Sequence, residues 1–144
     1  MTTLITDRLT LTPVALGDLD DLIALWADPA FATAIFPAPL SSEDVWFRLL
    51  RDIGHREALG HGNWAIRETA TGAYVGSVGV LDYRRIMTPA FDAPELGWGV
   101  APRFQGRGTT FEALREVSPM LASRNGLNTT DDTMAEVATK LAVN

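Results

Sequence analysis

The stretch that decides the fold is "ELGWGVAPRFQGRGTTFEAL", residues 95–114. In its first six residues, large apolar side chains alternate strictly with glutamate or glycine, and this period of two is typical of a β-strand. Leu96, Trp98 and Val100 point to one face, which we expect to be core, and Glu95 and two glycines point to the other. Glycine weakens a strand unless another segment or a ligand approaches it closely. The nearly bare face therefore predicts a close neighbour.

A glycine-rich basic turn follows this strand directly and opens a predicted helix. The unpaired amides and the dipole of a helix's first turn favour anions, and glycine lets the backbone approach phosphate oxygens. Gly106 and Gly108 supply that freedom, and Arg103 and Arg107 can add charge-assisted contacts. The alternative is a surface turn with incidental arginines. The strand before the turn and the helix after it favour an anion site.

The residues near the N-terminus predict one strand and two helices. Residues 8–14, "RLTLTPV", alternate apolar and polar side chains as a half-buried strand does. Residues 18–28 have apolar side chains at helical spacing, and we expect Asp18 to be the N-cap. A second helix over 41–53 begins at a capping-box-like spacing.

The middle of the chain predicts an antiparallel hairpin, with β-rich runs at 63–68 and 74–83 joined by a glycine-containing turn. The sequence contains no internal repeat or linker. The order of elements predicts a single domain over 1–144 of the mixed α+β class, with a mostly antiparallel central sheet flanked by helices.

Composition excludes several classes of function. The chain has 144 residues, of which 47% are hydrophobic, and its 18 acidic and 12 basic residues give a net charge of -6. This charge argues against a nucleic-acid partner, so any bound anion must be captured locally. With no cysteine and two histidines, His55 and His61, we expect no metal site. We find no signal peptide and no apolar run that could span a membrane, and we expect a cytoplasmic protein.

Three blocks of the chain resemble the GCN5-related N-acetyltransferase (GNAT) superfamily, and more narrowly its RimJ/RimL-type members. They are "TDRLTLTPV", "GNWAIRETATGAYVGSVGV" and "ELGWGVAPRFQGRGTTFEAL", in the family's order and at similar spacing. The resemblance covers residues 6–117, whereas 118–144 diverge. The family's pyrophosphate loop reads Gln/Arg-x-x-Gly-x-Gly/Ala, and Gln105, Gly108 and Thr110 occupy its three defined positions.

The resemblance implies acetyl-CoA as cosubstrate and no metal. The amides of the loop would hold the pyrophosphate, and the strand over 95–100 would pair with the pantetheine arm. The implied coenzyme-binding residues are Trp98, Val100, Arg103, Gln105, Gly106, Arg107, Gly108, Thr109 and Thr110.

The implied reaction is direct attack of an amine on a thioester, which requires a base to take the proton of an ammonium group. Glu95 is the candidate base, acting directly or through water, and a purely structural role is its alternative. The acceptor would be a small-molecule or peptide amine, such as a protein N-terminal α-amine. Trp26, Phe31, Phe36 and Trp46 lie where the family shapes its acceptor site, although their helical spacing favours core packing for each. We assign no role to His55 or His61.

Several departures from the family pattern accompany the match. Thr110 stands where Gly or Ala is usual, and Pro119 is expected to bend the last helix. Residues 129–135 contain too few apolar side chains to form the strand that the family has after its last helix, the family's fifth strand. We therefore expect a shortened C-terminal part, an exposed strand edge at 95–100 and, through that edge, a homodimer.

Three hypotheses follow from the match and its departures. The first is an active N-acetyltransferase. The second is a catalytically impaired relative that still binds CoA or acts as a structural partner. The third is a nucleotide-phosphate binder, against which stands the lack of a Walker-type lysine.

Overall fold

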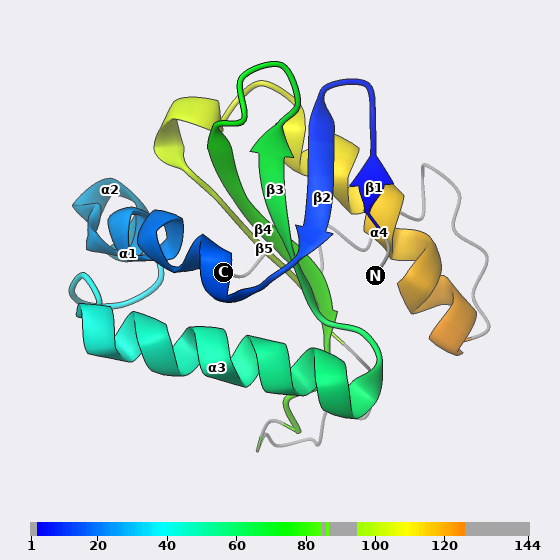
Figure 1. Ribbon diagram of the computed structural model, residues 1–144, viewed down its shortest axis with the longest axis horizontal. Coiled ribbons are helices and arrows are strands. Elements are labelled where there is room, and N and C mark those ends of the chain that lie inside the picture. The colour runs from blue at the N-terminus through cyan, green and yellow to red at the C-terminus, as the bar shows by residue number, and fades with distance from the viewer. Residues whose placement is uncertain (1–2, 85, 87–94, 126–144) are drawn as a thin grey trace.

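The computed structural model describes residues 3–84, 86 and 95–125. Within these residues, five strands form one sheet in which every neighbouring pair is antiparallel and the order follows the chain. The strands are β1 (Leu4–Ile5), β2 (Leu9–Pro13), β3 (Asn63–Glu68), β4 (Tyr74–Leu81) and β5 (Glu95–Val100). The sheet and its flanking helices confirm the predicted mixed α+β class (Figure 1).

Strand β4 lies very close to both of its neighbours because glycines occupy the contact points. A Cβ on Gly76 would lie 2.0 Å from the carbonyl oxygen of Gly99, and one on Gly79 would lie 2.5 Å from Oδ1 of Asn63. Neither position can accept a side chain without a shift of its neighbours. The spacing of β3, β4 and β5 therefore depends on these two glycines.

Helices α1 and α3 pack against one another on one side of the sheet, and α4 packs on the other (Figure 1). The helical elements are η1 (Leu16–Asp18), α1 (Leu19–Ala27), α2 (Pro29–Ala32), α3 (Ser42–Leu59), η2 (Pro102–Phe104) and α4 (Thr109–Asn125). None of the helices in the described part of the chain has the length and apolar character needed to cross a membrane.

Helix α3 begins as expected but continues beyond the predicted end at residue 53. Ser41 Oγ accepts a hydrogen bond from the Asp44 amide at 3.1 Å, which caps the first turn. Gly60 ends the helix in the left-handed conformation with φ 77°, and its amide donates to the Arg56 carbonyl at 2.8 Å. The later end follows from this glycine cap.

Asp18 does not cap α1 with its side chain, contrary to the prediction. Its carboxylate accepts a hydrogen bond from the Ala15 amide at 2.8 Å and pairs with Arg67 of β3 at 2.8 Å. Asp18 is only 5% exposed, so Arg67 supplies the charge that permits its burial. The acid thus attaches the start of α1 to the sheet.

Helix α4 covers the opposite face with the buried side chains of Ala113, Leu114 and Val117. The helix continues through Pro119 to Asn125, so the proline does not end it. The sequence predicted that residues 129–135 form no strand, and these residues lie outside the described part of the chain.

Candidate functional site

The turn between β5 and α4 has the backbone freedom that an anion site needs. Gly106 and Gly108 adopt left-handed conformations, with φ of 77° and 72°. A Cβ on Gly106 would meet no atom within 4 Å, and one on Gly108 would meet only Arg8, whose Nη2 is 3.7 Å away. Both glycines are exposed. The loop therefore presents open backbone where α4 begins, which fits the approach of a phosphate group.

Side chains of the turn attach it to the end of β5. The Gln105 side-chain amide donates to the Val100 carbonyl at 3.1 Å. Phe104 is buried, and its amide donates to the Ala101 carbonyl at 2.9 Å. The loop backbone is thus held in place before any ligand binds.

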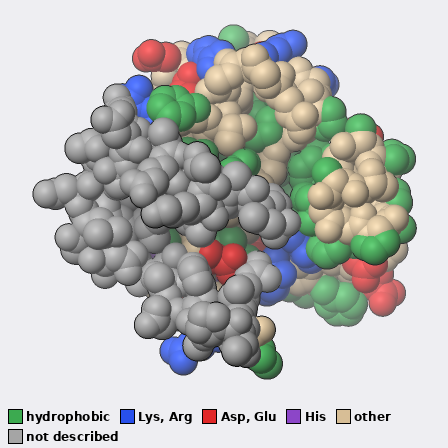
Figure 2. All heavy atoms as spheres, turned by 180° about the vertical axis from the view of Figure 1, so that it is seen from behind, with side chains coloured by type: hydrophobic (Ala, Val, Ile, Leu, Met, Phe, Trp, Pro, Cys, Tyr) green, Lys and Arg blue, Asp and Glu red, His purple; other side chains and the backbone are tan. Residues whose placement is uncertain are grey.

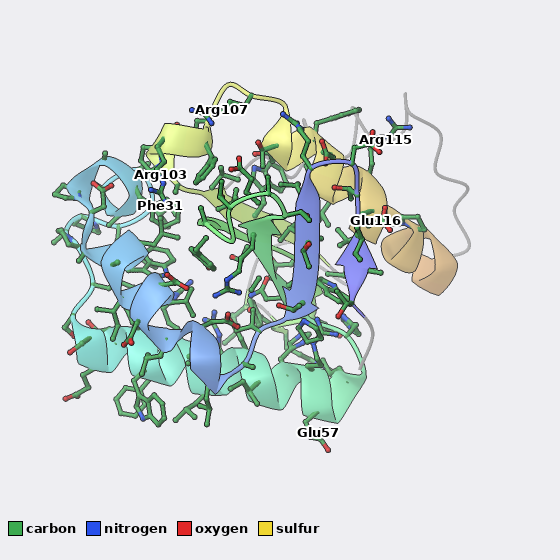
Figure 3. The ribbon with its side chains drawn as sticks, turned by 45° about the horizontal axis from the view of Figure 1, so that its top comes forward. Phe31, Glu57, Arg103, Arg107, Arg115 and Glu116 are labelled. Atoms are coloured by element: carbon green, nitrogen blue, oxygen red, sulfur yellow. The ribbon has the colours of Figure 1, made fainter. Side chains whose placement is uncertain are left out.

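Arg103 and Arg107 are both exposed at this turn (Figure 3). Their guanidinium carbons lie 4.9 and 5.5 Å from the centre of the Phe104 ring, so stacking restrains both cations without removing them from solvent. In the view from behind, arginine side chains lie along the upper edge of the molecule (Figure 2). The net negative chain therefore concentrates positive charge locally at this turn.

A hollow of about 250 Å³ lies where β5 ends and α4 begins. Val100, Gln105 and Thr110 line it together with Trp98 and Gly99. It thus brings together residues of the strand and of the loop to which the family resemblance assigned coenzyme binding. Its lining also includes Phe31 and Ile35. Thr109, in contrast, is the first residue of α4 and is buried.

A second cavity, of about 100 Å³, lies on the side of β5 that faces α1 and α3. Glu95 and Gly97 line it from the strand, and Arg48 and Arg51 line it from α3. Phe31, Ile35, Trp98 and Gly99 line both this cavity and the hollow at the end of β5. The two spaces therefore adjoin along β5, with Glu95 in the inner one.

The glycine face of β5 has protein neighbours. A Cβ on Gly99 would lie 2.9 Å from Cζ of Phe31, and one on Gly97 would lie 3.1 Å from Cδ1 of Leu81. The close neighbour that the sequence predicted at Gly99 is therefore the Phe31 ring of α2. Phe31 is only 5% exposed and also lines the cavity. It therefore packs in the core and forms part of the cavity wall, the two roles considered for it.

Tyr83, Arg48 and Arg51 are cavity residues to which the sequence analysis assigned no role at the site. The Tyr83 hydroxyl donates to Oδ1 of Asp52 at 2.9 Å, and Arg51 stacks over its ring at 4.5 Å. Burial and the neighbouring Asp52 raise the pKa of Tyr83 well above its ordinary value, so the phenol stays protonated. The spacing of 48 and 51 placed both arginines on one helix face, but only the fold shows that this face borders the cavity.

The two histidines form hydrogen bonds with backbone groups around the end of β4. His55 Nδ1 lies 2.8 Å from the His61 carbonyl oxygen, and His55 Nε2 accepts from the Asp82 amide at 2.9 Å. His61 is buried, with Nδ1 2.6 Å from the Val80 carbonyl oxygen. Across the described ranges, no three His, Asp or Glu side chains gather as they would around a metal ion.

The model of the acetyltransferase (GNAT) domain family matches residues 8–140. A GnaT-family acetyltransferase from Bordetella pertussis has 26% identity and a TM-score of 0.77, over 98% of this chain and 87% of that one. An acetyltransferase from Agrobacterium tumefaciens has 25% identity and a TM-score of 0.71, over 98% and 82%.

A more distant solved structure is the RimL ribosomal L7/L12 alpha-N-protein acetyltransferase in complex with coenzyme A. It has 15% identity and a TM-score of 0.68, over 96% of this chain and 82% of that one, and at this identity it shows the fold alone. No curated protein gives a significant match. The family model spans both the strand and the glycine turn of the site, and the chain belongs to the GNAT acetyltransferase domain family.

Proposed function

We propose that this protein is a single-domain N-acetyltransferase that transfers the acetyl group of acetyl-CoA to a primary amine. The observation that carries the proposal is the pair of adjoining spaces along β5, one at the glycine loop and one at Glu95. Such a pair suits a reaction in which a coenzyme and an amine meet from two directions. Membership of the acetyltransferase family supports this assignment over the nucleotide-phosphate alternative.

The loop residues would hold the coenzyme. The amides from Gly106 to Thr110 would bind the pyrophosphate, with Arg103 and Arg107 contributing charge from the exposed side. Trp98 and Val100 would line the pantetheine arm, since both border the hollow at the end of β5. When bound, the coenzyme supplies the thioester that the amine attacks.

Glu95 would accept the proton that the amine must lose before it can attack. It lines the inner cavity at the start of β5, where a bound amine could reach it directly or through one water. Glu95→Gln removes the proton acceptor but keeps the size of the side chain. It should lower kcat and remove the limb of the pH–rate profile that reports the base; an unchanged profile would eliminate Glu95 from this role.

The acceptor class that we propose is a protein or peptide N-terminal α-amine. The support is the RimJ/RimL-like sequence blocks and the fold shared with a ribosomal-protein α-N-acetyltransferase. A thiol-release assay over N-terminal peptides, free amino acids, polyamines and small amines tests it. Turnover of small amines alone would exclude the α-amine assignment without affecting the acetyltransferase proposal.

Calorimetric titration with acetyl-CoA and CoA tests the coenzyme site. Gly108→Val should abolish binding, because it adds a branched side chain to the loop backbone whose amides would hold the phosphates, with its Cβ 3.7 Å from Nη2 of Arg8. It also forces a branched side chain into a left-handed conformation, which strains the fold by about 1–2 kcal/mol. Gly60→Val is the matched control, because Gly60 has φ 77° and no atom within 4 Å of an added Cβ. Loss of binding in both variants, or in neither, would contradict the assignment of the loop.

A catalytically impaired relative is the second candidate function, and one observation favours it. The β-branched Thr110 lines the hollow at the end of β5, where the family pattern has Gly or Ala. Tight CoA binding without turnover of any amine would select this candidate. Absence of CoA binding would exclude both.

We also propose a homodimer, because β5 is the last strand of the sheet among the described residues. Light scattering across a concentration series measures the mass directly. A monomer at all concentrations would refute the dimer and would leave the proposed activity untouched.

A further inference from the structure

Arg8, just before β2, links the N-terminal segment to the glycine loop. Its Nη1 donates to the Arg107 carbonyl at 2.9 Å, and its Nε donates to Oε1 of Glu112 at 2.8 Å. The Arg8 backbone amide donates to Oε2 of the same carboxylate at 3.0 Å, and the Thr6 hydroxyl donates to that oxygen as well. One guanidinium therefore joins the loop to the first turns of α4.

The contact with Arg107 constrains the orientation of a loop amide. A trans peptide unit is planar, so the carbonyl of one residue and the N–H of the next point in opposite directions. Because Arg8 holds the Arg107 carbonyl, the Gly108 N–H must point away from Arg8. The Gly108 amide has no acceptor among the described residues, and it is one of the loop amides that we propose bind the pyrophosphate.

Glu112 holds the Arg8 guanidinium in the position that this geometry needs. Partial burial alone would raise the pKa of Glu112, but the hydrogen bonds from Thr6 and Arg8 and the charge of Arg8 together lower it. The carboxylate therefore stays ionised at neutral pH and restrains Arg8 through Nε and the backbone amide. Nη1 is then directed at Arg107.

The ion pair is too exposed to serve mainly as a source of fold stability. The Arg8 side chain is 49% exposed and that of Glu112 is 21% exposed, and pairs of this kind contribute little to the free energy of unfolding. A contact that joins Arg8 to the loop but adds little stability is better explained by the orientation that it gives to the loop backbone.

We propose that Arg8 is a positioning residue for the coenzyme, which acts by fixing the 107–108 peptide so that its amide faces the pyrophosphate. The inference rests on the proposed function, because it requires that the loop binds CoA. It predicts a defect confined to ligands that carry the pyrophosphate.

The first test is calorimetric titration of CoA into wild type, Arg8→Met and Arg8→Lys. Loss of one oriented hydrogen bond to a charged phosphate predicts an affinity about ten-fold lower or weaker still for Arg8→Met. Arg8→Lys should lose nearly as much, because one ammonium group cannot satisfy both the carbonyl and the carboxylate. Wild-type affinity in Arg8→Lys would overturn the positioning role, because it would mean that only the charge matters.

Glu112→Gln tests the same arrangement from the other side and remains informative if an Arg8 variant fails to fold. It should weaken CoA binding, and the double variant Arg8→Met/Glu112→Gln should lose no more than Arg8→Met alone. If Arg8 instead contacted the phosphates directly, Glu112→Gln would leave the affinity unchanged or raise it. That result would overturn the proposal.

Kinetics separate positioning from general damage to the fold. For the Arg8 variants, KM for acetyl-CoA should rise at nearly constant kcat, whereas KM for S-acetylpantetheine, which lacks the pyrophosphate, should not change. A rise in both KM values would contradict the proposal.

Arg115→Met is the charge-matched control, because Arg115 is an exposed cation on the same helix, three residues after Glu112, and borders the same surface hollow as Arg8 and Gly108 (Figure 3). It should bind CoA like wild type; an equal loss there would assign the effect to net charge. If wild-type protein does not bind CoA, the proposed function fails and this inference falls with it. If wild type binds and the Arg8 variants bind equally well, this inference alone is overturned.

Discussion

Gly99→Ala would insert a methyl group where the Phe31 ring already lies. The new Cβ would be 2.9 Å from Cζ and 3.1 Å from Cε1 of that ring, closer than such atoms normally approach. The ring has little room to move, because it is buried and meets Trp26 edge-on with ring centres 4.8 Å apart. Either α2 or strand β5 must therefore shift.

The expected cost follows from the overpacking of one methyl group. Such insertions into a packed interior typically destabilise by about 1–3 kcal/mol. For a domain of this size, that corresponds to a fall of about 3–10 °C in Tm. Because Phe31 and Gly99 line both the hollow and the inner cavity, the same shift should raise KM for coenzyme and for amine together.

Thermal unfolding followed by circular dichroism measures the cost, with Gly17→Ala as control because a Cβ there meets nothing within 4 Å. Phe31→Leu should relieve the clash, so Gly99→Ala should cost less in the Phe31→Leu background than in wild type. An unchanged Tm for Gly99→Ala, or equal costs in the two backgrounds, would refute the reasoning.

Three further predictions concern stability. Gly54→Ala should raise the free energy of unfolding by about 0.5–1 kcal/mol in urea denaturation, because Gly54 lies inside α3 with open space around its missing side chain. Arg67→Met should lower it by about 3 kcal/mol in the same assay, because buried Asp18 loses its cation. Partial burial raises the pKa of Glu112, but hydrogen bonds from Thr6 and Arg8 lower it below 4.5 overall, so its contribution is complete above that pH and disappears as pH falls through the lower folded value. Glu112→Gln should therefore flatten the acid limb of Tm against pH by a small amount, because the pair with Arg8 is largely exposed, and a steeper limb would contradict this assignment.

Local pattern was sufficient to predict four of the five strands in the described part of the chain, whereas the two-residue strand β1 was not predicted. The runs at 63–68 and 95–100 match β3 and β5 in their bounds, and the hairpin pairing is antiparallel as predicted. The prediction succeeds for these segments because the alternation of apolar and polar side chains is itself the consequence of burying one face of a strand. The glycine loop was found for a related reason, since a strand, two glycines and a helix start are all local features.

The contacts that complete the site could not be read from local pattern. Arg8 and Glu112 are separated by 104 positions, and their pairing depends on how α4 packs behind β2. Asp18 has the sequence signature of an N-cap, yet its carboxylate turns to Ala15 and Arg67 because the fold brings a cation to it. In both cases a tertiary partner outweighs the local preference.

The two halves of the proposed site depend on different parts of the chain, which makes their contributions separable. Arg8 and Glu112 lie on the α4 side and can change only how the loop presents its amides. Phe31 and Gly99 lie where the two spaces adjoin, so any change there alters both the thioester's surroundings and those of the amine. A substitution at Arg8 should therefore change the KM for one substrate and a substitution at Phe31 the KM for both. That difference follows from the geometry of β5, because Trp98 and Gly99 line both spaces while Val100, at the end of the strand, borders only the hollow at the loop.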